Sequence, residues 1–244
     1  MIEHFVDIET ADGAMNSFVI HPDEDGPHPV ILFLMDAPGM RDEIRDMCRR
    51  LASVGYYVVA GNLYYRRVRE WNRFELGGTV EELQAHMASL TNDMVVSDAG
   101  SMIGYADADE AADASRVGTL GYCMSGPFSL MTAARYNERV KAAASMHGVK
   151  LATDADDSPH RHLDEMNAEV YVAAAELDQH ITPEEVAAFS DALEASSTTG
   201  RVEWYPGTDH GFTFAGRGPI YDKAGSERHW ERLHSLFHRN LRMN

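Results

Sequence analysis

Two continuous apolar runs, at 30–35 and 56–60, constrain the fold of this 244-residue chain more than any other feature. A run without polar alternation is typical of a strand that is buried on both faces, as in a parallel sheet. Between the runs, residues 42–54 carry apolar side chains at helical spacing, and Gly55 follows as a helix stop. Strand, helix and strand in this order require a right-handed crossover, so the segment predicts a parallel βαβ unit.

The same alternation continues along the rest of the chain. Ahead of the first run, short strands at 5–9 and 15–20 are joined by Asp12-Gly13, a strong hairpin turn. The later predicted elements are helices at 80–90, 93–106, 127–136, 183–196 and 221–241, and strands at 116–122, 140–147, 170–175 and 201–205. No repeat or linker interrupts the pattern. We therefore predict a single α/β domain over 1–244, with a mostly parallel, doubly wound sheet, helices on both faces and a short N-terminal hairpin.

Composition limits the partners of the chain. The 39 acidic and 21 basic residues give a formal net charge of −18. This charge argues against nucleic acid and anionic membrane surfaces, which both require a basic face. There is no run of about 18 apolar residues, no signal peptide, and with two cysteines no disulfide framework. We expect a cytoplasmic protein with a small-molecule partner, no nucleic acid and no membrane. Nothing in the sequence specifies an oligomeric state.

The sharpest chemical feature is the hexapeptide 121–126 (G-Y-C-M-S-G), which follows a predicted strand and leads into a predicted helix. So tight a turn strains its central residue and needs small neighbours, which the two glycines and the serine supply. The turn would expose Cys123 at a helix N-terminus, where the helix dipole favours a thiolate. The N–H of Met124 would then face a developing oxyanion. The hexapeptide therefore predicts a nucleophilic cysteine.

Two other interpretations of this turn stay open. A free cysteine is most often a small buried hydrophobic residue, and this is how we interpret Cys48, on the apolar face of the helix at 42–54. Ser125 is an alternative nucleophile, but it lies past the tip of the turn. The position of Cys123 at the tip favours the functional interpretation.

A cysteine nucleophile needs a base and a group that orients the base. Asp178 follows the predicted strand 170–175, and His210 follows the predicted strand 201–205. Loops at the carboxyl ends of strands are where the chemistry of such sheets is found. Nucleophile, acid and histidine in this order match hydrolases with a nucleophile elbow. Glu176 competes with Asp178 as the acid.

These elements resemble the dienelactone hydrolase family (carboxymethylenebutenolidases) of the α/β-hydrolase fold, over nearly the whole chain. The matching segments are 121–126, 175–178 (A-E-L-D) and 210–212 (H-G-F). A cysteine at the tip of the elbow is a fairly specific mark, since most relatives of this fold use serine. The resemblance implies a Cys123–His210–Asp178 triad that hydrolyses an ester or lactone without a cofactor.

The family also carries an acidic residue, usually glutamate, just after the first buried parallel strand. In the family it holds the resting thiol and helps to deprotonate it. Here the residue is Asp36, which is one methylene shorter and is also compatible with a plain turn before Pro38. The N–H of Ala37 would be the second oxyanion donor, beside that of Met124.

Residues that bind the substrate are indicated less directly. Family members for dienelactones hold the substrate carboxylate with arginines, and Arg217, shortly after His210, is our candidate for this role. The wider set of candidate arginines is Arg41, Arg66, Arg67, Arg69, Arg73 and Arg217. Tyr64 is a candidate pocket residue, with ordinary packing as the alternative. The fragment 160–162 (H-R-H) lacks a zinc-site spacing, so we predict no metal site.

The first hypothesis is therefore a cofactor-independent hydrolase of esters or lactones that works through a thioacyl intermediate. A non-hydrolytic small-molecule-binding protein on the same fold is an alternative, since a fold does not fix a function. An acyltransferase that uses the same cysteine is another.

Overall fold

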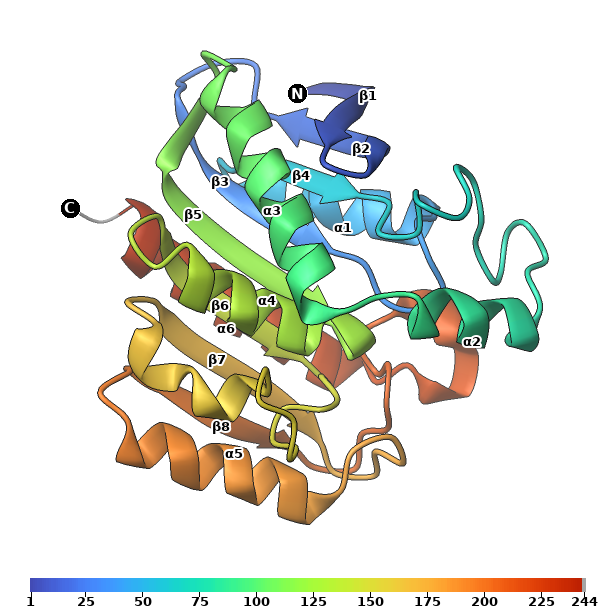
Figure 1. The fold of residues 1–244 in the computed structure, drawn as a ribbon, viewed down its shortest axis with the longest axis vertical. Helices are drawn as coiled ribbons and strands as arrows, with labels where there is room; N and C mark the ends of the chain where they lie inside the picture. The colour runs from blue at the N-terminus through green and yellow to red at the C-terminus, as the bar shows by residue number, and fades with distance from the viewer. Residues whose placement is uncertain (243–244) are drawn as a thin grey trace. The chain divides into compact units, whose positions relative to one another are not determined.

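The computed structural model describes residues 1–242. Within them, eight strands form one sheet in the order β1-β2-β4-β3-β5-β6-β7-β8 (Figure 1). The strands are β1 (Ile2–Thr10), β2 (Gly13–His21), β3 (His28–Leu34), β4 (Tyr57–Gly61), β5 (Ala112–Tyr122), β6 (Val140–Met146), β7 (Glu169–Ala175) and β8 (Gly200–Tyr205). The α-helices are α1 (Asp42–Ala52), α2 (Val80–Ala88), α3 (Asn92–Asp107), α4 (Gly126–Arg135), α5 (Pro183–Ala195) and α6 (Lys223–Phe237). This confirms the predicted α/β class.

The chain divides into two compact units, Met1–Val117 and Gly118–Asn244, and β5 contributes residues to both. In the first unit, β1 pairs antiparallel with β2, and β2 pairs antiparallel with β4. Thr10 pairs with Gly13, so the hairpin connection is Ala11-Asp12, one residue earlier than the predicted Asp12-Gly13. The predicted N-terminal hairpin is thus present with a corrected turn.

The predicted βαβ unit is confirmed, because β3 and β4 are parallel and α1 connects them. The buried face of α1 consists of the apolar residues that the helical spacing indicated, Ile44, Met47, Cys48, Leu51 and Ala52. Cys48 is fully buried, as predicted, and burial raises the pKa of its thiol. Cys48 is therefore a core residue.

In the second unit, β6, β7 and β8 are parallel neighbours, and α5 runs beside β8 (Figure 1). Short 3-10 turns add to the predicted elements at Cys123–Ser125, Pro159–Arg161, Leu163–Glu165 and Ala215–Ile220, and a π-helical turn, His238–Arg242, follows α6. The closing helix α6 begins later than the predicted 221–241, because the Asp222 side chain accepts a hydrogen bond from Gly225 N–H and caps it.

None of the helices in the described residues has the length and apolar character needed to cross a lipid bilayer.

Candidate active site

β5 ends in a sharp turn with Cys123 at its tip. Cys123 has a φ of 56°, a left-handed conformation that strains an L-residue. The chain then passes through one 3-10 turn, Cys123–Ser125, into α4. Gly121 permits this path, because a Cβ there would lie 1.9 Å from the carbonyl oxygen of Ser125. Cys123 is half-buried, whereas the Ser125 side chain is fully buried. The strand-to-helix turn indicated by the hexapeptide is present.

His210 and Asp178 form a buried pair in the same unit. Nδ1 of His210, in the loop after β8, donates a hydrogen bond of 2.7 Å to Oδ2 of Asp178, in the loop after β7. The two side chains are 10% and 2% exposed, respectively. The other carboxylate oxygen of Asp178 accepts the N–H of His180 at 2.8 Å. Asp178 therefore fixes both the orientation and the tautomer of the His210 ring.

The pKa of His210 is raised to about 10. Burial, the largest influence, acts to lower this pKa, but the hydrogen bond to Asp178 and the interaction with the Cys123 side chain outweigh it. Nε2 of His210 has no hydrogen-bond partner of standard geometry among residues 1–242. The Cys123 side chain nevertheless lies close enough to raise this pKa. Such contacts often tighten only when substrate binds.

Two further histidine rings pack edge-on against His210. The ring centroid of His147, after β6, lies 4.9 Å away, and that of His180 lies 4.5 Å away. His147 is buried, and its Nε2 lies 3.1 Å from Oγ1 of Thr213. Burial, reinforced by the charge of His210, holds the pKa of His147 well below its usual value. A neutral ring therefore lies beside His210. Sequence reasoning missed His180, whose only signal is its place two residues after Asp178.

Glu176, the competing acid, is engaged elsewhere. It is exposed, and its Oε2 accepts a hydrogen bond from Gly207 N–H at 2.7 Å. The structure thus pairs His210 with Asp178 rather than with Glu176.

Arg217 lies in the Ala215–Ile220 turn, close to the loop that carries His210. Its Cζ is 5.5 Å from the ring centroid of Phe214 and 3.9 Å from the position that a Cβ would take on Gly211. Its positive charge also helps to lower the pKa of His147. The three packed rings of His147, His180 and His210 form a histidine cluster. Arg217 therefore supplies a positive charge close to His147 in this cluster.

Asp36 lies in the first unit, where Arg41 binds it. Its fully buried carboxylate accepts hydrogen bonds from the guanidinium at 2.5 and 3.2 Å. Arg41 is 2% exposed and also contacts Glu43. Burial acts to lower the pKa of Arg41, but Asp36 and Glu43 raise it overall, so the guanidinium is charged. A substrate carboxylate would have to displace these internal partners. Thiol activation by Asp36 stays a prediction.

Replacing Asp36 with asparagine is expected to lower the free energy of unfolding by about 3 kcal/mol, because the buried Arg41 loses its main counter-charge. Urea denaturation measures this. Asp42→Asn is the matched control, because Asp42 pairs with Arg45 on an exposed surface and should change stability little. Equal effects of the two substitutions would contradict the structural role of the Asp36–Arg41 pair.

Ala37, the candidate oxyanion donor after Asp36, is 4% exposed. Its carbonyl accepts a hydrogen bond of 2.8 Å from the Tyr64 hydroxyl, whereas its N–H meets no acceptor in the described part of the chain. Tyr64 is 1% exposed and stacks on His86 at a centroid distance of 4.9 Å. Tyr64 therefore contacts the protein interior, and its predicted contact with substrate stays untested. Met124, the other candidate donor, is buried in the 3-10 turn after Cys123.

No group of three histidine, cysteine or carboxylate side chains converges as a metal site within residues 1–242. In the fragment 160–162, Nδ1 of His160 contacts Oγ of Ser158, and Nδ1 of His162 contacts Glu165.

The profile of the dienelactone hydrolase family matches residues 15–241. The chain belongs to this family. A relative from Escherichia coli O157:H7 named "Putative carboxymethylenebutenolidase" is 28% identical over 241 residues, covering 97% of this chain and 87% of its own length. Family membership supports a hydrolase function.

Solved structures agree with this assignment. The structure titled "Putative Dienelactone Hydrolase" from Klebsiella pneumoniae superposes with a TM-score of 0.86 at 26% identity, covering 97% of this chain and 98% of the other. A dienelactone hydrolase from Anabaena variabilis gives a TM-score of 0.72 at 17% identity, with 99% of both chains covered, which bears on the fold alone. The predicted α/β-hydrolase fold is confirmed.

Proposed function

We propose that this dienelactone hydrolase family member cleaves carboxylic esters or lactones through Cys123, His210 and Asp178, with no cofactor in any step. The observation that carries the proposal is the buried His210–Asp178 hydrogen bond beside a cysteine held in a strained turn. Strained backbone and a strongly shifted pKa cluster at functional sites. The family relationship supports the same reaction class.

In the first step, the His210 imidazolium holds the proton that the Cys123 thiol has given up, and the sulfur attacks the substrate carbonyl carbon. A C–S bond forms, and the carbonyl π electrons move onto the oxygen. The N–H group of Met124 would stabilise this oxyanion. Collapse of the tetrahedral intermediate breaks the C–O bond, and His210 returns its proton to the leaving alkoxide. Asp178 stabilises the imidazolium throughout.

The second step needs His210 as a base. The Cys123 side chain is one of the two partners that raise the pKa of His210 in the resting state. Acylation neutralises the sulfur, so the pKa of His210 falls in the thioacyl intermediate. The neutral imidazole can then take a proton from water, and the resulting hydroxide attacks the thioester. Release of the acid restores the starting pair.

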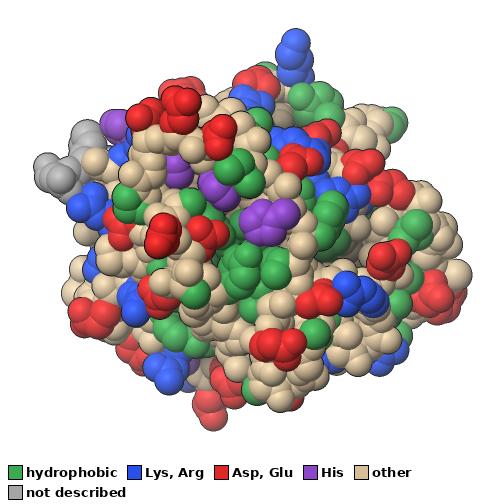
Figure 2. Space-filling view, turned by 90° about the horizontal axis from the view of Figure 1, so that it is seen from above, with side chains coloured by type: hydrophobic (Ala, Val, Ile, Leu, Met, Phe, Trp, Pro, Cys, Tyr) green, Lys and Arg blue, Asp and Glu red, His purple; other side chains and the backbone are tan. Residues whose placement is uncertain are grey.

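The charge of the chain bears on substrate binding. Figure 2 shows Asp and Glu side chains spread over one face of the molecule, with Lys and Arg side chains among them. The net charge of −18 would repel an anionic substrate. Arg217, near the histidine cluster, is the proposed local attraction for a substrate carboxylate. Thiol activation by Asp36 is a further role that only the resemblance suggests, and the place of Tyr64 at the end of a strand–loop segment suggests a pocket residue.

Arg217→Gln is expected to raise KM for a carboxylate-bearing lactone about tenfold, because it removes a charge-assisted hydrogen bond. KM for a neutral short-chain ester should change little. Arg201→Gln is the control in the same unit, since Arg201 lies on the surface beside Glu203. Steady-state kinetics with both substrates decide the matter, and an equal rise in KM for the neutral ester would refute the proposed carboxylate contact.

A panel of lactones and short-chain esters, assayed with the wild type and with Cys123→Ser, tests the proposed reaction. Turnover by the wild type, with markedly altered rates for the serine variant, is expected. Product analysis with an added alcohol or amine separates hydrolysis from acyl transfer. No turnover of any substrate, despite tight binding, would favour the binding protein instead.

A further inference from the structure

His147 follows β6 in a backbone conformation that few residues adopt. Its φ is 37°, in the left-handed region, and its side chain is buried. The backbone is held there, because the His147 N–H donates a hydrogen bond of 2.8 Å to the carbonyl of Ala173 on β7. A left-handed residue other than glycine carries strain, and such residues cluster at functional sites. The proposed reaction nevertheless uses His147 in no step.

The segment 147–149 contacts both the turn that carries the nucleophile and the base itself. At one end, Val149 N–H donates a hydrogen bond of 3.3 Å to the carbonyl of Cys123. At the other end, the His147 ring meets the His210 ring edge-on, with 4.9 Å between the centroids. All of these residues belong to the second unit. The segment therefore links the nucleophile and the base within one compact part of the chain.

A hydrogen bond from the loop after β8 fixes the His147 ring. Nε2 of His147 shares a hydrogen bond of 3.1 Å with Oγ1 of Thr213, which lies three residues after His210. Thr213 is itself anchored, because its carbonyl accepts a hydrogen bond of 3.1 Å from the Ser226 hydroxyl on α6. Nδ1 of His147 has no partner within residues 1–242. The contact with Thr213 is thus the hydrogen bond that orients the ring.

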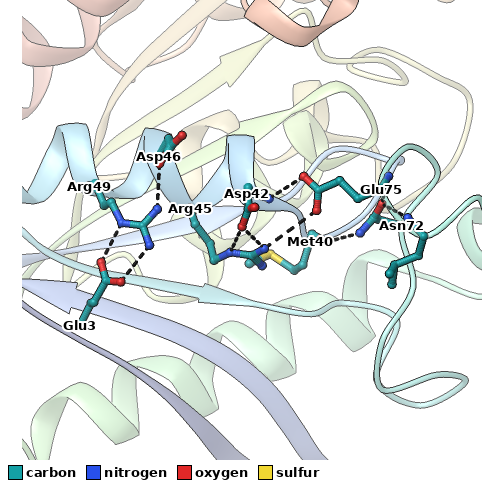
Figure 3. A network of polar contacts seen from close by, with 9 residues as sticks. Glu3, Met40, Asp42, Arg45, Asp46, Arg49, Asn72 and Glu75 are labelled. Carbon is teal, nitrogen blue, oxygen red and sulfur yellow. Dashed lines mark hydrogen bonds and ion pairs between the residues drawn. The ribbon is translucent and has the colours of Figure 1, made fainter.

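This contact differs from the polar contacts at the protein surface. Figure 3 shows a surface network beside α1, in which Arg45 pairs with Asp42. Water replaces such a pair when it breaks, so its loss costs little. His147 and Thr213 are both buried, and the loss of either leaves a polar atom without a partner away from water. An apolar side chain would fill the same space without this risk, so packing alone does not explain a histidine here.

The His210 ring needs a support besides Asp178. The hydrogen bond at Nδ1 holds one ring atom and leaves the ring able to tilt about that contact, whereas proton transfer requires Nε2 to face the reacting sulfur. His147 and His180 both restrict this tilt, since each ring meets His210 at an angle of 67°. His180 is exposed, whereas His147 is buried and fixed by Thr213. His147 is therefore the more rigid support.

We propose that His147 is a positioning residue: its ring, fixed by Thr213, keeps Nε2 of His210 directed toward Cys123. His147 acts through His210 and exchanges no proton itself. This inference rests on the proposed function, in which Cys123 and His210 carry the chemistry. The low pKa of His147 supports it, because a neutral ring does not repel the His210 imidazolium.

Thr213→Val replaces the hydroxyl with a methyl group and tests this role. We expect kcat for ester or lactone hydrolysis to fall about tenfold, with KM within about threefold of the wild type, because a misplaced base slows the chemical step. Alkylation of Cys123 by iodoacetamide at about pH 7, followed by mass spectrometry, should slow in parallel. Thr213→Ser keeps the hydroxyl and should recover most of the rate. His147→Asn tolerates the left-handed backbone but lacks the ring, and should lose at least as much as Thr213→Val.

Thr198→Val is the matched control in the same unit. Thr198 is also buried, and its hydroxyl donates to the carbonyls of Leu163 and Met166, ahead of β8 rather than after it. Both valine variants should lose about 2–10 °C of melting temperature, because each leaves buried polar atoms without a partner. Only Thr213→Val should lose kcat. A similar loss of kcat in both would indicate a general effect of lower stability and would overturn the inference.

The remaining outcomes separate this inference from the proposed function. If Cys123→Ala is inactive while Thr213→Val and His147→Asn keep the wild-type kcat, only the role of His147 is overturned. An increase in KM alone would indicate a substrate contact, and a Thr213→Ser variant as slow as Thr213→Val would show that the hydroxyl is not the group that matters; each result overturns the inference. Activity that survives Cys123→Ala would overturn the proposed function and the role of His147 with it.

Discussion

Cys123→Ala is expected to lower kcat/KM for a lactone or short-chain ester by about 10,000-fold or more, because no nucleophile remains to form the thioacyl intermediate. His210→Ala should cause a loss of similar size, since the members of such a unit are not additive. The fold should persist, because alanine keeps the Cβ that residue 123 already carries at its φ of 56°. Steady-state kinetics, with circular dichroism and thermal melts for each variant, measure both effects.

The chain offers its own control for this experiment. Cys48 is the other cysteine, and it is fully buried on α1. Cys48→Ala should lose some stability to a small cavity but keep its turnover per folded molecule. Full turnover of simple esters by Cys123→Ala would exclude the proposed mechanism.

Asp178→Asn is expected to reduce kcat about 1,000- to 10,000-fold, because the amide no longer fixes the tautomer of His210 or stabilises its charged form. Glu176→Gln is the matched control, since Glu176 is exposed and accepts a hydrogen bond from Gly207 N–H rather than from His210. It should retain wild-type kcat. A similar loss in both variants would contradict the assignment of Asp178 as the orienting acid.

Asp178→Asn is also expected to change the free energy of unfolding by an amount that depends on pH. The pKa of His210 is raised to about 10 in the folded protein, above the ordinary value near 6.5. The charged ring therefore contributes stability that is fully present below about pH 6.5 and is lost as the pH rises toward 10. Removal of the Asp178 carboxylate lowers this pKa. The difference in free energy of unfolding between the wild type and Asp178→Asn should shrink from about pH 6.5 to about pH 9.5, as urea denaturation at both values would show. A constant difference would mean that His210 is not the group linked to Asp178.

Much of the fold was predictable because burial leaves a pattern in the sequence. β3 and β4 lie on the two continuous apolar runs, and the buried face of α1 is the one that helical spacing indicated. β5 was predicted only from 116 onward, although it begins at Ala112. Its first residues are partly exposed and carry no apolar run, so periodicity offers no signal there.

The candidate site was predictable only in part. Cys123 could be predicted because a tight turn demands small neighbours, and Asp178 and His210 because each follows a predicted strand. The contacts of Asp36 with Arg41, and of Tyr64 with Ala37, could not be foreseen. Loop residues have no period that assigns them a face, so their partners depend on the three-dimensional path of the chain.

The close approach of Gly121 to Ser125 bears on how this protein can evolve. Any side chain at position 121 would collide with the backbone, so the turn does not tolerate a substitution of Gly121. Residue 123 already holds a side chain in the left-handed conformation, and an exchange of sulfur for oxygen leaves the backbone path unchanged. The reactive atom at position 123 can therefore change while Gly121, two residues earlier, must stay for the turn to form. A lineage, or a protein engineer, can change the chemistry of the nucleophile while the turn that presents it stays the same.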